Sequence, residues 1–344
     1  MTGLEATLAN AVVLAGFLDA LGQFLRPENL ASVLVDGLAK AAIYVMIAGG
    51  LTLIFGLMGV LNFAHGSMTM IGAYLGGLLM VFAVGGTTGG ATRLLAFFLA
   101  LAATFALLAG LGGVVEVTLI RRLYDRPPVY QILLTFGLTL VLDELVRIAV
   151  LFYGMQPTSD WQAALGTKPG FLAQSVDLGL ISVSGLSLFE IVVGAATVAG
   201  LWAFLTRTRY GLVIRAGSED AEMTEALGID VRRVFTVVFA LGAGVAGAAG
   251  TLLMWDPAWG ASVPLAADTL LPAFVVVIIG GLGTFRGTVV AAVIVGMADA
   301  VTTWWFVNHV DFASLPEMTV FLILVVMLVL RPQGLFGVEE VGGH

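Results

Sequence analysis

GGLTLIFGLMGVLNFAHGSMTMIGAY, residues 49–74, is apolar almost throughout but contains six glycines and one polar knot, Asn62-Phe63-Ala64-His65-Gly66. Polar groups at membrane depth are costly unless protein or a water-filled cavity satisfies them. Asn62 and His65 are three residues apart and would share a helix face. We therefore expect them to border a path or gate. The simpler alternative is that Asn62 caps a helix and His65 rests at the membrane interface.

The composition of the chain indicates an integral membrane protein. Of its 344 residues, 59% are hydrophobic and only 11% are charged, and the mean hydropathy is +1.04. A soluble domain carries about 25% charged residues. Long runs of Leu, Val, Ala, Gly and Phe predict helices, because a membrane barrel would show short alternating segments. The net charge of −8 does not point to nucleic acid.

The hydrophobic runs predict an all-α, polytopic bundle with about nine spans (roughly 8–10), since one span needs about 20 apolar residues. The expected spans lie near residues 33–55, 62–84, 94–119, 130–153, 184–205, 234–254, 268–282, 287–306 and 318–330. The seventh and ninth are short. We assign residues 31–337 to one transmembrane domain and residues 1–30 to an N-terminal extension. Within that extension, residues 4–25 form either a further span or an interfacial helix.

The basic residues predict the orientation, because cytoplasmic loops are enriched in Lys and Arg. With alternating spans, one side of the membrane receives Arg121, Arg122, Arg126, Arg207, Arg209, Arg215, Arg232, Arg233, Arg286 and Arg331. The other side keeps Arg26, Arg93 and Lys168. The first side is therefore predicted to be cytoplasmic, with the C-terminus inside. Five tryptophans are expected near the outer interface: Trp161, Trp255, Trp259, Trp304 and Trp305.

The loop 206–233 is the most highly charged stretch of the chain. Ser218 can cap a helix of about ten residues, with Glu219 and Asp220 in its first turn and Gly228 just after its end. Such a short helix is marginal in water unless it packs on something. We expect a docking helix for a soluble cytoplasmic partner, or else a solvated loop with a surface helix.

Other polar residues have candidate partners within the chain. Glu116 is close in sequence to Arg121 and Arg122, and Asp143 and Arg147 have the i,i+4 spacing of an ion pair. Asp299 lies deep in a predicted span, where an ionisable group is a pathway candidate. Burial against a neighbouring hydroxyl, such as that of Thr302 or Thr303, is equally open. The glycines Gly242, Gly244, Gly247 and Gly250 form a small-residue face suited to close helix packing.

Several kinds of chemistry are not supported by the sequence. The two lysines, Lys40 and Lys168, do not lie in a Gly-x-x-x-x-Gly-Lys-Ser/Thr phosphate loop. The histidines His65, His309 and His344 are scattered, and cysteine is absent. We therefore expect no catalytic site, no metal site and no cofactor on this chain.

The motifs resemble those of the permease subunits of branched-chain amino-acid ABC importers. Residues 49–74 resemble the family's first signature, and Arg215 to Ile229 followed by 234–253 resemble its coupling segment. Glu225-Ala226-Leu227-Gly228 is the best match to the Glu-Ala-Ala…Gly pattern of ABC importers, with Leu in the third position. Further matches are Glu116…Arg121-Arg122…Arg126-Pro127-Pro128, Leu134–Arg147, Ile278–Gly287 and Arg331–Gly337. The resemblance covers nearly the whole chain from about residue 33, but not the Gly154–Val183 loop.

This resemblance implies a permease subunit of the bacterial inner membrane that imports leucine, isoleucine, valine or related small amino acids. It implies two cytoplasmic ATPase subunits that hold ATP and Mg²⁺, a second homologous permease or a second copy, and a periplasmic or lipoprotein solute-binding protein. The implied ATPase-coupling residues are Arg215, Glu219, Asp220, Glu222, Glu225, Ala226 and Gly228. The surrounding lipid is a further partner.

Three alternatives stay open at this stage. Related importers carry urea or short amides, and much of the selectivity in such systems lies in the binding protein. An ATP-independent secondary transporter or channel would need charges at mid-membrane, for which Asp299 is the only deep candidate. An assembly subunit without transport activity would need no polar path, which the Asn62–His65 knot argues against.

Overall fold

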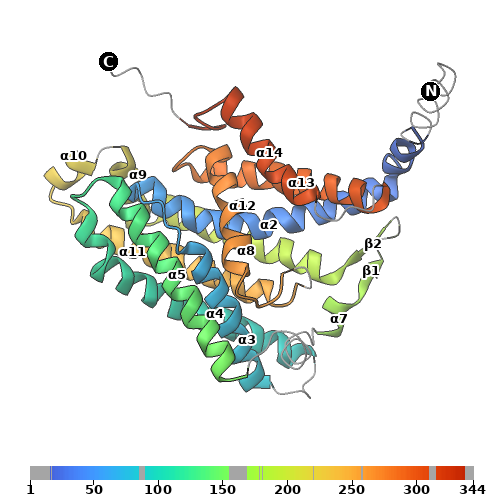
Figure 1. The fold of residues 1–344 in the computed structure, drawn as a ribbon, viewed down its shortest axis with the longest axis horizontal. Helices are drawn as coiled ribbons and strands as arrows, with labels where there is room; N and C mark the ends of the chain where they lie inside the picture. The colour runs from blue at the N-terminus through green and yellow to red at the C-terminus, as the bar shows by residue number, and fades with distance from the viewer. Residues whose placement is uncertain are drawn as a thin grey trace, which may run out of the picture.

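The computed structural model describes residues 16, 18–84, 90–154, 169–177, 179, 181–219, 221–256, 259–309 and 315–337. The described chain is mostly helical, with one small two-stranded sheet (Figure 1). Of the predicted extension 1–30, residues 16, 18–24 and 27–30 are helical, and the last four belong to the helix Pro27–Met58, so the predicted domain boundary falls inside that helix. The choice between a further span and an interfacial helix for residues 4–25 falls largely outside the described residues.

The predicted hydrophobic segments each coincide with a helix. These are α2 (Pro27–Met58), α3 (His65–Val84), α4 (Gly90–Thr118), α5 (Pro128–Phe152), α8 (Gly185–Arg207), α11 (Val231–Leu253), α12 (Leu265–Gly280), α13 (Phe285–His309) and α14 (Leu315–Leu330). Six described segments are long and apolar enough to cross a membrane, within α2, α3, α4–η1, α8, α11 and α13. The helices α12 and α14 are shorter and apolar, as expected for the seventh and ninth segments.

Short elements connect these helices. They are η1 (Ile120–Leu123), α7 (Gly170–Ala173), β1 (Ser175–Asp177), β2 (Ser182–Ser184), α9 (Arg209–Glu219) and α10 (Ala221–Ala226). The antiparallel β1–β2 pair lies in the loop 154–183, for which the sequence predicted no element. Three-residue strands with largely exposed side chains leave too weak an alternation to detect.

Proline and glycine set several helix boundaries. Pro27 and Pro128 occupy first-turn positions, where a missing N–H costs nothing. α2 ends at Gly59, whose φ of 64° suits a residue without a side chain. α12 ends at Gly281, with a φ of 99°. Gly59 therefore fixes where the chain turns between α2 and α3, and Gly281 fixes the turn between α12 and α13.

Helix α11 packs against α4, α3 and α2, and most of its residues are buried. Its glycines are the contact points. A Cβ on Gly242 would lie 2.8 Å from the Gly50 carbonyl oxygen of α2, and one on Gly247 would lie 2.7 Å from Leu108 Cγ of α4. Gly250 lies against the backbone of α3 at Thr69. The predicted close packing of these glycines is confirmed, but they do not form a single face, because they contact three different helices.

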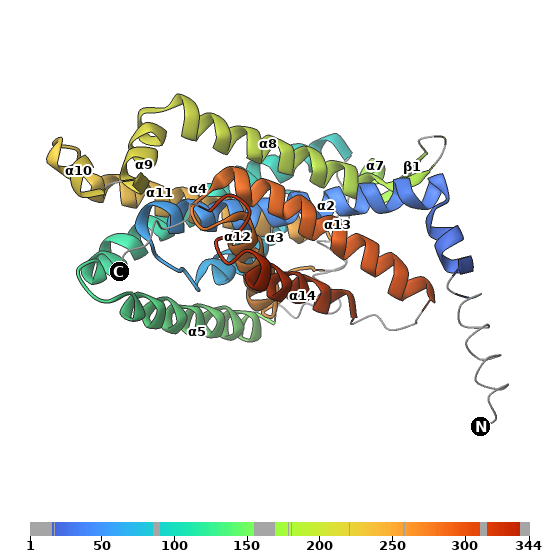
Figure 2. The ribbon, with the colours of Figure 1, turned by 90° about the horizontal axis from the view of Figure 1, so that it is seen from above.

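The outer faces of the bundle carry large apolar side chains. On α5, which lies across the bundle from α8 in Figure 2, Leu133, Leu140 and Leu151 are exposed. On α14, Leu322 and Val329 are exposed. Such faces suit lipid rather than water. They therefore agree with a multi-pass membrane protein.

Trp255 corrects one prediction of the sequence. It is not part of an interfacial belt, because it is 2% exposed and stacks on Phe97 with ring centroids 4.2 Å apart. The segment after α11 turns inward, so a residue next to a span end lies in the core. Trp161 falls outside the described residues.

Replacing Gly250 by alanine is expected to lower the stability of the bundle. The new methyl group would collide with the backbone of α3, and overpacking of this kind costs about 1–3 kcal/mol. Gly137→Ala on α5 is the matched control, because a Cβ there meets nothing within 4 Å. Thermal unfolding in detergent checks this. Equal midpoints for the two variants would contradict the close approach of α3 and α11.

Candidate functional site

The polar knot between α2 and α3 is fully buried. Asn62 and His65 are both 0% exposed, but they do not share a helix face as predicted. Asn62 lies in the turn before α3, where its Oδ1 accepts a hydrogen bond from the Ala64 N–H at 3.1 Å. Asn62 therefore orders the turn before α3, but the amide that it accepts from precedes the helix, so this contact is not the predicted bond to the first helical turn. His65, in contrast, lies in the protein interior and not at an interface.

The contacts of His65 define its tautomer. Its Nε2 lies 2.9 Å from the Ile47 carbonyl oxygen of α2, so Nε2 carries the proton and donates. Its Nδ1 is then a buried acceptor without a hydrogen-bond partner among the described residues. Nδ2 of Asn62 is a buried donor that also has no partner among them. Unsatisfied buried polar atoms are uncommon and call for an explanation. The knot thus offers one free acceptor and one free donor in the interior.

Asp299 lies between α13 and α2, and its carboxylate is well satisfied. Lys40 Nζ lies 2.6 Å from Oδ1, and the Tyr44 hydroxyl donates to Oδ2 at 2.8 Å. The Thr303 hydroxyl lies 3.0 Å from Oδ1, as the alternative of a neighbouring hydroxyl proposed. The carboxylate therefore links the two helices, and its place in a transport path stays a prediction.

The predicted coupling helix is in fact two helices. α9 begins at Arg209, so Ser218 lies inside α9 and not at the N-terminus of a helix. The apolar run 211–214 explains the difference, because Ile214 is 6% exposed and packs into the cluster that contains Leu53, Leu57 and Leu205. α9 is thereby anchored on the bundle. α10 follows, and Gly228, with a φ of 83°, ends its turn as predicted.

The predicted coupling residues are spread over this segment. Arg215 is exposed on α9, and Glu219 is the last residue of α9. Glu222, Glu225 and Ala226 belong to α10, and the latter two are exposed. Asp220 lies outside the described residues. Beside them, Met223 of α10 and Leu227, which follows α10, are 59% and 75% exposed, so this segment presents apolar side chains at the surface.

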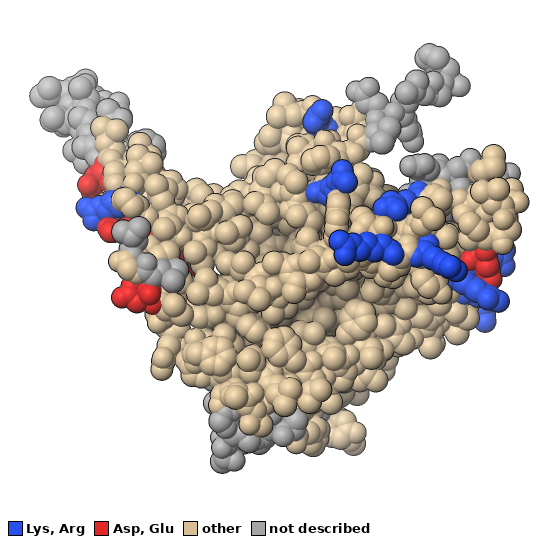
Figure 3. Space-filling view, turned by 180° about the vertical axis from the view of Figure 1, so that it is seen from behind, with Lys and Arg blue, Asp and Glu red and all other residues tan. Residues whose placement is uncertain are grey.

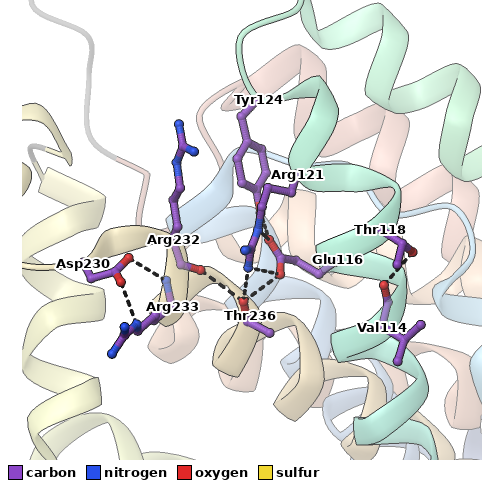
Figure 4. Close-up of polar contacts among 9 residues, drawn as sticks. All are labelled: Val114, Glu116, Thr118, Arg121, Tyr124, Asp230, Arg232, Arg233 and Thr236. Carbon is purple, nitrogen blue, oxygen red and sulfur yellow. Dashed lines mark hydrogen bonds and ion pairs between the residues drawn. The ribbon is translucent and has the colours of Figure 1, made fainter.

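A buried carboxylate joins α4 to α11 next to this segment (Figure 4). Glu116 of α4 is 0% exposed and accepts from Arg121 Nε at 3.2 Å and from Arg121 Nη2 at 2.9 Å. The Tyr124 hydroxyl donates at 2.6 Å, and the Thr236 hydroxyl of α11 lies 2.7 Å from Oε2. The sequence predicted the Arg121 partner. It gave no sign of Tyr124 and Thr236, because these contacts depend on how η1 and α11 fold back.

The environment of Tyr124 fixes its protonation state. Burial, together with the hydrogen bond to Glu116, raises the pKa of the Tyr124 phenol above its ordinary value. The phenol therefore stays protonated at neutral pH and donates to the carboxylate.

The N-terminus of α11 has a side-chain cap. Asp230 accepts a hydrogen bond from the Arg233 N–H at 3.2 Å (Figure 4).

One predicted ion pair is replaced by two other contacts. Asp143 accepts from the Ser67 hydroxyl at 2.6 Å, whereas Arg147 pairs with Glu144 at 3.6 Å. Asp143 faces α3, and both members of the Glu144–Arg147 pair are exposed on α5. The i,i+4 spacing places Asp143 and Arg147 near each other on α5. The Asp143 carboxylate nevertheless forms its hydrogen bond with Ser67 of α3.

Replacing Glu116 by glutamine is expected to destabilise the protein by about 1–3 kcal/mol, because a buried amide cannot accept all the hydrogen bonds that the carboxylate accepts. The matched control is Glu144→Gln, whose exposed pair should contribute at most about 0.5 kcal/mol. The thermal midpoint in detergent measures both. A Glu116→Gln midpoint equal to that of the control would show that the cluster does not brace α4 and α11.

Comparison with known proteins identifies the family. The family model described as "Branched-chain amino acid transport system / permease component" matches residues 33–330. The high-affinity branched-chain amino acid transport system permease protein BraD of Pseudomonas aeruginosa is 28% identical over 311 residues, 90% of this chain and 96% of that protein. LivH of Escherichia coli (strain K12), a permease protein with the same description, is 26% identical over 310 residues, 89% of this chain and 95% of that protein.

One solved structure is also similar. PsaBC from Streptococcus pneumoniae in complex with Fab gives a TM-score of 0.47 at 15% identity and covers 93% of this chain and 97% of that chain. The family assignment rests on the family model, which covers most of the chain. The chain therefore belongs to the family of permease components of branched-chain amino acid transport systems, as its motifs predicted.

Proposed function

We propose that this chain is the translocation subunit of an ATP-driven importer for branched-chain amino acids. Two ATPase subunits, which hold ATP and Mg²⁺, would dock on the α9–α10 segment. A second permease, homologous or identical, would complete the path, and a soluble binding protein would deliver the substrate from outside. The observation that carries this proposal is the charged segment with exposed apolar tips at Met223 and Leu227, in a chain of this family.

The proposed topology has nine crossings and a cytoplasmic C-terminus, in the bacterial inner membrane. The six long apolar segments supply six crossings, and α5, α12 and α14 would supply the others. Lys and Arg side chains gather on the end of the molecule that carries α9 and α10 (Figure 3). The enrichment of basic residues in cytoplasmic loops supports placing this end inside the cell.

The proposed coupling runs from α10 into the bundle. Closure of the ATPases would displace α10, and the turn at Gly228 leads directly to Asp230 and the first turn of α11. Thr236, in the second turn of α11, contacts Glu116 of α4. A displacement of α10 would thus reach α11 and α4 together.

The polar knot is the proposed gate of the path. Asn62 Nδ2 and His65 Nδ1 supply a donor and an acceptor that the described protein atoms do not satisfy. A zwitterionic amino acid, with an ammonium and a carboxylate, could bond to both kinds of group. The carboxylate of Asp299 already accepts hydrogen bonds from Lys40 and Tyr44. Among the predicted path residues, we therefore favour Asn62 and His65 as the ones that contact the substrate.

Transport in reconstituted vesicles tests the proposed function. The chain is purified with its co-purifying subunits and binding protein, and uptake of radiolabelled leucine and urea is compared with and without ATP on the ATPase side. We expect ATP-dependent leucine uptake. ATP-dependent urea uptake would show that the substrate is urea and not leucine, but it would still support an ATP-driven importer. Equal flux with and without ATP, in an intact complex, would favour the secondary transporter or channel.

Replacing Leu227 by aspartate is expected to lower ATP-coupled uptake by about tenfold or more, because a charged side chain would replace the exposed apolar one at the proposed contact with the ATPase. The thermal stability of the permease itself should change by less than about 0.5 kcal/mol, since the site is on the surface. Leu227→Met is the matched control and should keep both uptake and ATPase co-purification. Normal coupling in Leu227→Asp would remove α10 from the docking surface.

A further inference from the structure

Two adjoining cavities form a groove on the face of the bundle that carries α8. The first, of about 380 Å³, lies between the C-terminal ends of α2 and α8, the middle of α9, the α12–α13 turn and Phe336. The second, of about 880 Å³, follows α8 from Ala195 to Arg207 and touches Val289 of α13. Both are lined by Trp202 and Thr206. We call the two together the α8–α13 groove.

One end of this groove is basic. Its described lining includes Arg207, Arg215 and Arg286 and contains no Asp or Glu. The Arg286 guanidinium lies 4.9 Å from the centroid of the Trp202 ring, an arrangement that fixes the side chain without neutralising it. Among the residues that the structure describes, neither Arg207 nor Arg286 forms an ion pair. In Figure 3, which shows this side of the molecule, basic side chains border a hollowed part of the surface.

The other end of the groove is apolar. Ala195, Val198, Ala199, Ala203 and Val289 line it. The helical rise of 1.5 Å per residue gives about 18 Å from position 195 to position 207. One leaflet of a bilayer core of about 30 Å is about 15 Å thick. The groove therefore extends from the charged end of α8 to about the depth of one leaflet.

We propose that the α8–α13 groove binds an anionic phospholipid, with its phosphate at Arg207 and Arg286 and an acyl chain along α8. Guanidinium groups bind phosphate oxygens in a bidentate manner, and basic pockets between spans on the cytoplasmic side are suited to lipid headgroups. A small phosphate compound would leave the apolar part of the groove empty, and a lipid without net charge would leave the arginines uncompensated. The leaflet assignment rests on the proposed topology, but the binding chemistry does not.

The lipid would also connect moving parts. The basic end of the groove is lined by α9 through Ile214 and Arg215, by α2 through Leu57 and by the C-terminal segment through Phe336. A bound lipid would contact all three elements, with its headgroup at Arg215 and its apolar part at Leu57 and Phe336. The lipid is thus placed where it would brace the coupling segment against the bundle.

Cysteine protection tests the proposal in the assembled complex, since the chain has no native cysteine. Thr206→Cys places a thiol in the groove, and Thr118→Cys is the matched control. Both residues are exposed and both hydroxyls bond the i−4 carbonyl at 2.7 Å. Phosphatidylglycerol at about ten times its Kd should slow maleimide labelling of Thr206→Cys about tenfold by mass action. Phosphatidylcholine with the same acyl chains should protect much less, and Thr118→Cys should not respond.

Two variants separate the headgroup from the acyl chain. In the Thr206→Cys background, Arg207→Gln with Arg286→Gln should abolish the preference for phosphatidylglycerol. Ala199→Leu should reduce protection by filling the apolar end, whereas Ala196→Leu, on α8 but outside the groove lining, should not. Equal protection by both lipids, equal protection by glycerol phosphate alone, or a thiol already covered by a second permease without lipid would overturn the proposal. Because labelling measures binding, these outcomes are independent of transport.

Discussion

The close approach of α11 to its neighbours depends on the absence of side chains at a few positions. A Cβ on Gly50 would lie 2.7 Å from the Gly242 carbonyl oxygen and 3.0 Å from His65 Cε1. Gly50 therefore admits both the backbone of α11 and the imidazole of His65. Within a membrane, where water cannot satisfy a displaced polar group, such contacts decide which hydrogen bonds exist. The bond from His65 Nε2 to the Ile47 carbonyl oxygen is one of them.

Two buried carboxylates, Glu116 and Asp299, each join a pair of helices. Glu116 is fully buried and is surrounded by Arg121, Tyr124 and Thr236, so its charge is compensated where α4 meets α11. Asp299 is compensated by Lys40 and by two hydroxyls where α2 meets α13. Removing the basic partner of either pair leaves a buried carboxylate uncompensated, which is more costly than the pair is stabilising. The two clusters thus favour one relative placement of these helices.

The sequence was sufficient for features that depend on local chemistry. Hydrophobic length predicted the main helices, and the glycine spacing of α11 predicted close packing. Gly228 marked the end of the coupling helix because the residue after a helix end often adopts a positive φ. Features that depend on tertiary contact were missed. Asp143 bonds Ser67 and not Arg147, Trp255 turns into the core, and α9 extends to Arg209 because Ile214 finds a buried site.

The arrangement of these contacts constrains how the proposed coupling can work. α10 is short, and its following turn leads into α11 at the Asp230 cap, whose first turns carry Thr236 and, further on, Gly242. Since Thr236 is held by Glu116, the start of α11 cannot shift without the end of α4. Gly242 lies against Gly50, beside the ring of His65, so the same shift would change the space around His65 Nδ1. The free acceptor of the knot is therefore placed where a movement that begins at α10 would alter its surroundings, as a gate requires.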